Sequence, residues 1–102
     1  MTNQITHWIN GKSWTGKTDK KGDVFNPATG LKTGEVDFAD ISTIDEAINA
    51  AHNAFPNWRD TSLTKRAQII FKFRELLNEK KEELAKIITS EHGKVISDTL
   101  GE

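Results

Sequence analysis

The segment from Leu63 to Leu77 constrains this chain most, because its apolar side chains surround more of a helix than a small domain can cover. Successive residues of an α-helix are rotated by about 100°, so one buried face takes roughly every third or fourth residue. Here the apolar positions are denser than that: Leu63, Ala67, Ile69, Ile70, Phe71, Phe73, Leu76 and Leu77. We therefore predict a helix that leaves a contiguous apolar patch exposed in a single copy.

The composition fits one small domain with a modest core. The chain has 102 residues, of which 35% are hydrophobic, and a formal net charge of -1. Nucleic-acid binders instead present a basic surface. The basic residues Lys17, Lys20 and Lys21 are interrupted by Asp19 and Asp23, so a solvated hairpin loop explains them better than a phosphate-binding patch. We expect no nucleic-acid partner.

The cellular location is predicted from what the composition lacks. The start of the chain has neither the basic region nor the apolar region of a secretory signal. No apolar stretch approaches the ~20 residues that span a bilayer. The absence of cysteine excludes disulfides and thiolate metal sites and fits a reducing compartment. We expect a cytoplasmic protein without a membrane partner.

The first third of the chain is patterned as two β-hairpins. Asn10-Gly11 is a strong signal for a two-residue turn, because both turn positions need positive φ. In the second hairpin, Pro27 fixes φ early in the turn and Gly30 supplies a left-handed residue near its exit. Residues 31–37 then return as a strand, with Gly34 as a candidate bulge.

The rest of the chain carries helical periodicity. Three helices are predicted, at Ser42–Phe55, Ser62–Leu77 and Glu79–His92. Ser42 and Asn78 are predicted N-caps. Pro56 is predicted to end the first helix because it has no N–H, and Gly93 to close the third in left-handed geometry.

A fourth helix is predicted to begin at Ser97, where Leu100 starts a new apolar face. The chain reaches Glu102 within about one turn, and a helix that short does not stand alone. We expect a truncated domain over 1–102, with hairpins in 1–37 and helices in 42–102.

Few residues suggest chemistry. The seven glycines stand singly and form no phosphate-binding motif, and no serine lies in G-x-S-x-G. His7, His52 and His92 include no i, i+4 pair, so we predict no metal site. Arg59 and Arg66 could clamp an anion, but pairing with neighbouring carboxylates or helix-end carbonyls explains them better. The tryptophans are better explained as packing anchors than as ligand platforms: Trp8, Trp14 and Trp58.

In their order and spacing, several short motifs resemble the opening part of NAD(P)-dependent aldehyde dehydrogenases. The resemblance covers the chain from about Trp8 to Glu102. It rests on Trp8-Ile9-Asn10-Gly11-Lys12-x-Trp14, Phe25-Asn26-Pro27-Ala28-Thr29-Gly30, Ala54-Phe55-Pro56-x-Trp58, Arg66 through Leu77, and Ile87-Ile88-Thr89-x-Glu91-x-Gly93-Lys94.

Within this family, three stretches are most similar to the CoA-acylating branch that acts on methylmalonate semialdehyde. They are Trp58-Arg59-Asp60-Thr61, Arg66-Ala67-Gln68-Ile69-Ile70-Phe71, and Ser97 to Glu102. Val95-Ile96 and Thr99 depart from the pattern of that branch, which bears on the substrate and not on the family.

The resemblance implies an α/β, aldehyde dehydrogenase-like fold for the parent family. This segment would be two β-hairpins followed by three α-helices and the start of a fourth. It also implies an enzyme that converts methylmalonate semialdehyde, NAD and CoA to propionyl-CoA. In that family a cysteine thiolate attacks the aldehyde, and an Asn side chain and a backbone N–H stabilise the oxyanion.

The residues that perform this chemistry in the family have no counterpart in this chain. The chain has no cysteine, and in the family the oxyanion Asn and the dinucleotide-binding residues follow this segment. Some relatives hold a monovalent cation between carbonyls before the Asn-Pro pair and an Asp before x-Gly-Lys; here Val24, Phe25 and Glu91 stand there. We therefore predict no catalytic, cofactor-binding or metal residue in this chain.

Two hypotheses follow. The first is an amino-terminal piece of an aldehyde dehydrogenase that is inactive alone. The second is a non-enzymatic interaction module. The exposed apolar face of Leu63–Leu77 is common to both, and through it we expect self-association or association with homologous aldehyde dehydrogenase subunits.

Overall fold

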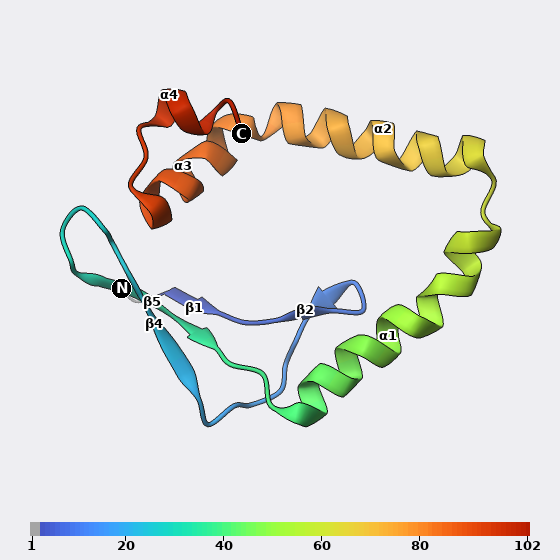
Figure 1. Cartoon of the computed structure of the whole chain (residues 1–102), viewed down its shortest axis with the longest axis horizontal. Coiled ribbons are helices and arrows are strands. Elements are labelled where there is room, and N and C mark those ends of the chain that lie inside the picture. Colours follow the sequence, from blue (N-terminus) through green and yellow to red (C-terminus); the bar gives the residue numbers. More distant parts are fainter. Residues whose placement is uncertain (1–2) are drawn as a thin grey trace. The chain divides into compact units, whose positions relative to one another are not determined.

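The computed structural model describes residues 3–102, which form two compact units. The first unit comprises the described residues up to Val24 together with Lys32–Asp60, and the second comprises Phe25–Leu31 with Thr61–Glu102. In chain order the elements are β1 (Asn3–Ile5), β2 (Trp8–Ile9), β3 (Lys12–Ser13), β4 (Lys21–Phe25), β5 (Lys32–Asp37), α1 (Ile41–Asp60), α2 (Leu63–Glu79), α3 (Lys81–His92) and α4 (Ile96–Thr99). Figure 1 shows these elements and labels all of them except β3.

The first hairpin is confirmed. β2 and β3 pair antiparallel, with Trp8 opposite Ser13 and Ile9 opposite Lys12. Asn10 and Gly11 between them have φ values of 55° and 75°. Positive φ at both central positions is the backbone that a tight two-residue turn requires, and asparagine and glycine adopt it most readily.

The second hairpin is also confirmed, and its turn is closed by local hydrogen bonds. The Asn26 N–H donates to the Leu31 carbonyl and the Gly30 N–H donates to the Asn26 carbonyl, each at 2.8 Å. The Asn26 side chain accepts from the Ala28 N–H at 2.9 Å, as asparagine commonly does in turns. Gly30 has a φ of 72°, the left-handed conformation predicted for it.

The sheet contains a third strand that the sequence pattern did not predict. β1 pairs parallel with β5, so that the strand order is β1-β5-β4. Gly34 lies in this regular pairing opposite Asn3, and a Cβ at Gly34 would stand 2.8 Å from the Asn3 carbonyl oxygen. The glycine therefore permits β1 to approach β5 closely, and its pairing with β1 shows no bulge.

Helix α1 begins earlier and ends later than predicted. Asp40, and not Ser42, caps it, because the Asp40 carboxylate accepts the Thr43 N–H at 2.8 Å. Pro56 lies inside the helix and does not end it. Proline removes one hydrogen bond, to the carbonyl four residues earlier. That carbonyl belongs to His52, which is exposed, so water can satisfy it.

Helices α2 and α3 follow as predicted, with shifted boundaries. Ser62 caps α2 by accepting the Lys65 N–H at 3.2 Å. Asn78 is not the N-cap of α3, because α2 continues through it to Glu79. Gly93 ends α3 with a φ of 86°, as predicted, and donates its N–H to the Thr89 carbonyl.

The short α4 is preceded by Val95 in the N-cap position, so the predicted cap at Ser97 is wrong. In this second unit, α3 and α4 pack on each other through Thr89 and the buried Thr99, whose hydroxyl groups lie 3.2 Å apart. Thr99 also donates to the Val95 carbonyl. Since both hydroxyls have partners, this polar contact does not leave a buried group unsatisfied.

The hydrophobic core of the described residues is very small. Among residues 3–102, the buried hydrophobic residues are Ile9 and Ala85, one in each unit. Most large apolar side chains remain exposed, including those of α1 and α2. The composition predicted a modest core, and the described residues bury even less than that, because most of their large apolar side chains stay exposed.

Candidate functional site

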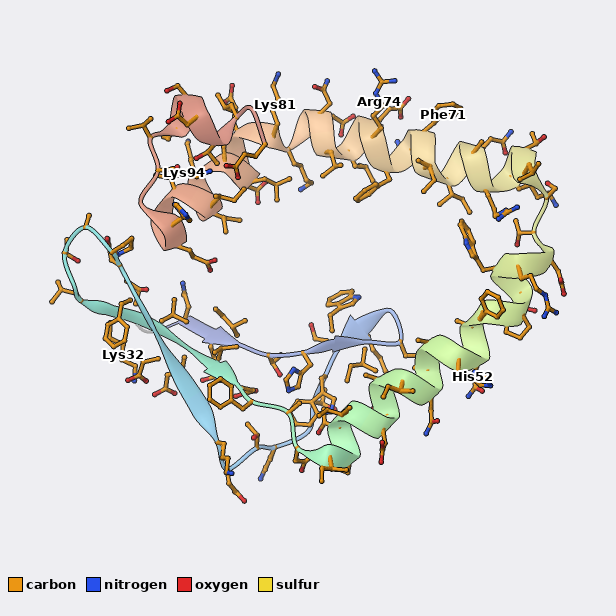
Figure 2. The ribbon with its side chains drawn as sticks, in the orientation of Figure 1. Lys32, His52, Phe71, Arg74, Lys81 and Lys94 are labelled. Carbon is orange, nitrogen blue, oxygen red and sulfur yellow. The ribbon has the colours of Figure 1, made fainter. Side chains whose placement is uncertain are left out.

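The largest candidate surface is the apolar face of α2, which we call the α2 face. It consists of seven large side chains, each at least 40% exposed: Leu63, Ile69, Ile70, Phe71, Phe73, Leu76 and Leu77. No residue of α2, which lies wholly within the described part of the chain, is buried. Figure 2 shows Phe71 and Arg74 projecting from the same side of this helix. The predicted exposure of these apolar side chains is confirmed.

The α2 face is broad because its residues do not keep to a single helical stripe. At about 100° per residue, they occupy more than half of the helix circumference. The remaining arc is polar and carries Gln68, Lys72 and Glu75, of which Lys72 and Glu75 form an exposed ion pair at 3.5 Å. The helix therefore has a solvated side and a wide apolar side.

Arg66 lies in the middle of the α2 face, one turn before Ile70 and two turns before Phe73. Its Nε atom is covered from solvent yet has no hydrogen-bond partner among the described residues. A covered donor without an acceptor costs free energy that a partner oxygen would recover. The sequence suggested anion binding by Arg66 but gave no sign that its own surroundings lack an acceptor.

Arg59, unlike Arg66, has an acceptor within its own chain. Its guanidinium pairs with the neighbouring Asp60 carboxylate at 3.0 Å and lies 5.7 Å from the centre of the Phe55 ring. The interpretation of Arg59 as a partner of a nearby carboxylate is confirmed.

The three tryptophans differ in whether they pack against other residues of the chain. Trp14 packs as predicted, edge-on to the His7 ring with the ring centres 4.9 Å apart, and its indole N–H points at Glu46 at 3.4 Å. Trp8 is 72% exposed and Trp58 is 41% exposed, so neither is anchored within this chain. Within the described residues, Trp8 is therefore not a packing anchor, and Trp58 is only partly covered.

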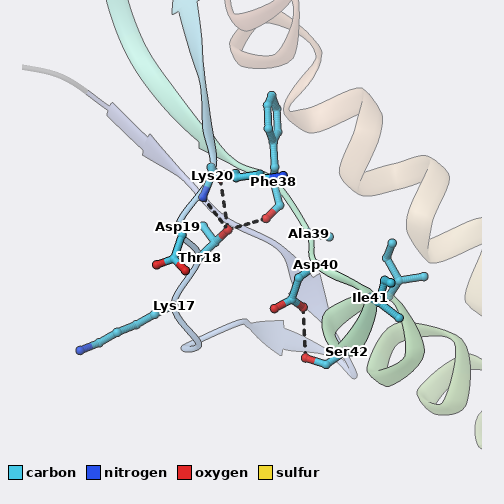
Figure 3. Close-up of a pocket in the computed structure, with 10 residues that line it drawn as sticks. Lys17, Thr18, Asp19, Lys20, Phe38, Ala39, Asp40, Ile41 and Ser42 are labelled. Carbon is cyan, nitrogen blue, oxygen red and sulfur yellow. Dashed lines mark hydrogen bonds between the residues drawn. The ribbon is translucent and has the colours of Figure 1, made fainter.

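A second candidate is an open depression of about 600 Å³ at the start of α1 (Figure 3). Its lining comes from the loop before β4 and from the segment joining β5 to α1: Lys17, Thr18, Asp19, Lys20, Phe38, Ala39, Asp40, Ile41, Ser42 and Ile44. The Thr18 hydroxyl links the two segments by donating to the Phe38 carbonyl at 2.7 Å. Lys17 extends away from the depression.

Asp40 is the carboxylate at the centre of this depression, and one of its oxygens is already engaged. One oxygen accepts the Thr43 N–H, the Thr43 hydroxyl and the Ser42 hydroxyl, at 2.8, 2.8 and 3.1 Å. The bond from the Thr43 N–H, and then those from the two hydroxyls, hold the pKa of Asp40 below its ordinary value of 3.8. Asp40 therefore fixes the start of α1 and is poorly suited to acid or base catalysis near neutral pH.

Two of the motifs noted in the sequence meet within the second unit. A Cβ on Gly93 would lie 3.2 Å from the Pro27 ring, so the turn after β4 packs against the end of α3. Lys94, just beyond, pairs with Glu102. The motifs that contain Pro27 and Gly93 therefore form a structural contact between a turn and a helix end.

Metal and membrane sites were also sought in residues 3–102. This described part contains no group of three or more histidine, cysteine, aspartate or glutamate residues placed to hold a metal ion. None of its helices combines the length and the apolar character needed to cross a membrane.

Comparison with known proteins gives consistent results. Residues 14–102 match the model of the aldehyde dehydrogenase family. A malonate-semialdehyde dehydrogenase from Pseudomonas aeruginosa is 43% identical over 98 residues, which are 96% of this chain and 20% of that protein.

Solved structures agree in sequence and in backbone. A methylmalonate-semialdehyde dehydrogenase from Oceanimonas doudoroffii is 44% identical and superposes on 99% of this chain with a TM-score of 0.92. A Sinorhizobium meliloti protein described as a methylmalonate-semialdehyde dehydrogenase, and complexed with NAD, is 38% identical, with a TM-score of 0.95 over 99% of this chain.

These similarities cover only part of the known proteins. The chain spans about one fifth of the length of the relatives that it matches: 20% of the Pseudomonas aeruginosa and Oceanimonas doudoroffii proteins and 21% of the Sinorhizobium meliloti protein. Because the family match runs through almost the whole chain and the backbone follows that of solved members, the chain belongs to the aldehyde dehydrogenase family.

Proposed function

We propose that this chain is a scaffold segment of an NAD-dependent semialdehyde dehydrogenase whose substrate is malonate or methylmalonate semialdehyde, with CoA accepting the acyl group. In this proposal the segment supplies packing surfaces and no catalytic residue. Alone, it neither binds NAD nor oxidises an aldehyde.

The observation that carries the proposal is the agreement on substrate class among the relatives. The Pseudomonas aeruginosa protein is a malonate-semialdehyde dehydrogenase, and the Oceanimonas doudoroffii protein is a methylmalonate-semialdehyde dehydrogenase. Each is more than 40% identical to this chain, and the match covers almost the whole length of this chain. Both substrates are short aldehydes that carry a carboxylate.

The scaffold role is supported by the side chains that the segment carries. Covalent aldehyde oxidation in this family needs a thiolate to form the thiohemiacetal, and the chain has no cysteine. Asp40, the carboxylate at the centre of the depression at the start of α1, is engaged in capping that helix. Its broadest surface, the α2 face, is apolar and suits packing better than catalysis.

The first test uses the isolated chain. Purified protein is mixed with NAD and methylmalonate semialdehyde, with and without CoA, and NADH is followed by absorbance. We expect no NADH above a protein-free blank and no heat of NAD binding in the micromolar range by calorimetry. Sustained turnover by a contaminant-free sample would contradict the proposal.

The second test restores the missing parts. The chain is co-expressed with Pseudomonas aeruginosa malonate-semialdehyde dehydrogenase that has been shortened by the region matched here. We expect NAD reduction from the pair, with kcat/KM at least about tenfold higher for malonate or methylmalonate semialdehyde than for propanal, a difference of about 1.4 kcal/mol. Equal rates with propanal would exclude the proposed substrate class.

The exposed α2 face also favours a second candidate function, a non-enzymatic interaction module. Such a module would have to fold by itself before it meets a partner. Sedimentation and thermal denaturation separate the two functions, because an independent module gives a monodisperse species with a cooperative transition, whereas a scaffold segment does not.

A further inference from the structure

We propose that the Asn10-Gly11 turn is a self-modification site, at which Asn10 loses its side-chain amide to form aspartate and isoaspartate, and that the isoaspartyl product opens the β2–β3 hairpin. The reaction takes water as its co-reactant and uses no group outside the turn. The inference is independent of the proposed function, because it concerns the backbone chemistry of the first unit.

The modification begins at the backbone nitrogen of Gly11. This nitrogen attacks the side-chain carbonyl carbon of Asn10, a new C–N bond closes a succinimide ring, and the side-chain amino group leaves as ammonia with the Gly11 N–H proton. Water then opens the ring. Cleavage of the new C–N bond gives aspartate, and cleavage of the original peptide bond gives isoaspartate, whose backbone runs through the former side chain. No atom is oxidised or reduced.

The first observation is that Asn10 is the only asparagine of the chain that is followed by glycine. A side chain on the following residue hinders the approach of its nitrogen, and glycine has no side chain. Asn26 cannot react in this way because Pro27 has no N–H. Larger residues follow the remaining asparagines, which are Asn3, Asn49, Asn53, Asn57 and Asn78.

The second observation is that the structure leaves the Asn10-Gly11 pair exposed and unrestrained. Both residues are exposed, in the turn beside the β2 label of Figure 1. Within residues 3–102, neither the Asn10 side chain nor the Gly11 N–H forms a hydrogen bond. The Asn26 side chain, in contrast, accepts the Ala28 N–H at 2.9 Å. The attacking nitrogen and the carbonyl carbon of the turn are therefore free to meet and open to water.

The third observation is that the strands flanking the turn are short. β2 and β3 form two residue pairs, and the Trp14 N–H adds one hydrogen bond to the His7 carbonyl at 2.8 Å. A two-stranded hairpin is only marginally stable by itself, so its local opening costs little free energy. The backbone rotation that closes the succinimide ring is therefore accessible without unfolding of the whole unit.

The two products differ in their effect on the hairpin. Aspartate keeps the original backbone and tolerates the positive φ of 55° that Asn10 holds. Isoaspartate inserts the former Cβ into the backbone, so the turn no longer has the two-residue length that sets the register of β2 and β3. Ile9, one of the buried hydrophobic residues of the described part, lies directly before the turn. The isoaspartyl product therefore opens the pairing of β2 with β3 and exposes Ile9.

The first experiment ages the purified chain in neutral buffer and maps the amide-to-acid mass increase by digestion and mass spectrometry. We expect conversion at Asn10 to be at least about tenfold faster than at every other asparagine, a difference of about 1.4 kcal/mol in activation free energy. Electron-transfer fragmentation should identify both aspartate and isoaspartate at this position. Equal or faster conversion at another asparagine, or the absence of isoaspartate at position 10, would overturn the proposal.

Gly11→Ala tests the attacking nitrogen, with Lys12→Ala as the matched control in the same hairpin. The added methyl group hinders the attack. Alanine also strains a backbone with a φ of 75°, and a strained turn opens more often, which alone would speed the reaction. We expect conversion at position 10 to fall by about tenfold in Gly11→Ala and to stay unchanged in Lys12→Ala, which keeps the Asn-Gly pair. Equal rates in the two variants would contradict the proposed route.

The last experiment tests the structural effect of the isoaspartyl product. The isoaspartyl form is separated by chromatography and compared with Asn10→Asp, which represents the other product. Hydrogen exchange of the Trp14 amide reports on the hairpin, and that of the Gly93 amide, which donates to the Thr89 carbonyl at 2.9 Å, reports on the second unit. We expect Trp14 to exchange at least about tenfold faster in the isoaspartyl form and Gly93 to exchange equally in both. Equal exchange at Trp14, or a matching change at Gly93, would contradict opening of the hairpin by this product.

Discussion

Asp40 shows how one side chain sets the start of a helix, with Ser42 and Thr43 as its donors. Both Asp40 and Ser42 are good N-cap residues, and Ser42 alone was predicted. The structure selects Asp40 because its carboxylate reaches the Thr43 N–H at 2.8 Å, while the Ser42 hydroxyl turns back to donate to that same carboxylate.

The cap makes the start of α1 sensitive to acid. The pKa of Asp40 is lowered in the folded state, so the stabilisation is fully present above the ordinary value of 3.8 and is lost as the pH falls through the lower folded value. We expect the amide resonance of Thr43 to titrate with a midpoint below 3.8. Asp40→Asn should keep the cap and abolish that titration; a midpoint above 3.8 in the original chain would contradict this account.

Gly93, in contrast to Asp40, matters for its backbone conformation. It holds a φ of 86° at the end of α3, and a Cβ there would lie 3.2 Å from the Pro27 ring. We expect Gly93→Ala to lower the free energy of unfolding of this unit by about 1–2 kcal/mol, measured by urea denaturation followed by circular dichroism. Gly101→Ala is the control, because its added methyl group would meet nothing closer than 3.5 Å. Equal effects of the two substitutions would show that the left-handed backbone is not the cause.

At the level of elements, the turns and helices were predictable and their ends were not. Asn10-Gly11 and Gly30 have conformations that few other residues adopt, so their turns follow from local chemistry. The three-residue strand β1 pairs with β5, about thirty positions away, and no local pattern reports such a partner. Pro56 was expected to end α1, but a single lost hydrogen bond on the exposed side of a 20-residue helix is tolerated.

Pro56 offers a test at this level. Pro56→Ala restores the N–H that the interior of α1 lacks, and alanine is favoured over proline there by up to about 3 kcal/mol. We expect higher helix content, measured by circular dichroism. His52→Ala, one turn earlier on the same exposed helix, should change stability by less than about 1 kcal/mol. A loss of helix content in Pro56→Ala would mean that the proline is required for the native path of α1.

The candidate surface was partly predictable at the same level. The apolar spacing of residues 63–77 predicts the α2 face directly. Its side chains are exposed because no other element of the unit buries them. The buried, unpartnered Nε donor of Arg66 could not be predicted, since whether an acceptor lies nearby depends on the packing of the whole unit. The packing of Trp14 and the exposure of Trp8 and Trp58 differ for the same reason.

At the scale of the whole molecule, the exposed apolar area limits stability. Leaving a large apolar side chain in water forfeits about 1.5–3 kcal/mol, and small domains are stable by only about 5–15 kcal/mol. The α2 face alone contains seven such side chains, each partly exposed. The described residues therefore bury too little apolar surface to make the isolated chain very stable.

We expect the isolated chain to self-associate, aggregate or remain partly unfolded at tens of micromolar. Sedimentation velocity measures this directly, with Phe73→Asp as the variant that should shift the distribution toward smaller species and Gln68→Asp as its control. A monodisperse monomer with a cooperative thermal transition would show that the chain closes its own core and would favour the independent module.

The bare α2 face also has a consequence for synthesis on the ribosome. In the relatives, about four fifths of the polypeptide lies outside the matched segment. At about 5–20 residues per second, a remainder of roughly 390 residues takes about 20–80 s to translate. When that remainder follows the segment in the chain, the apolar side chains of α2 stay exposed to solvent for this interval. The nascent chain is then a natural client for chaperones that bind extended apolar surfaces near the exit tunnel.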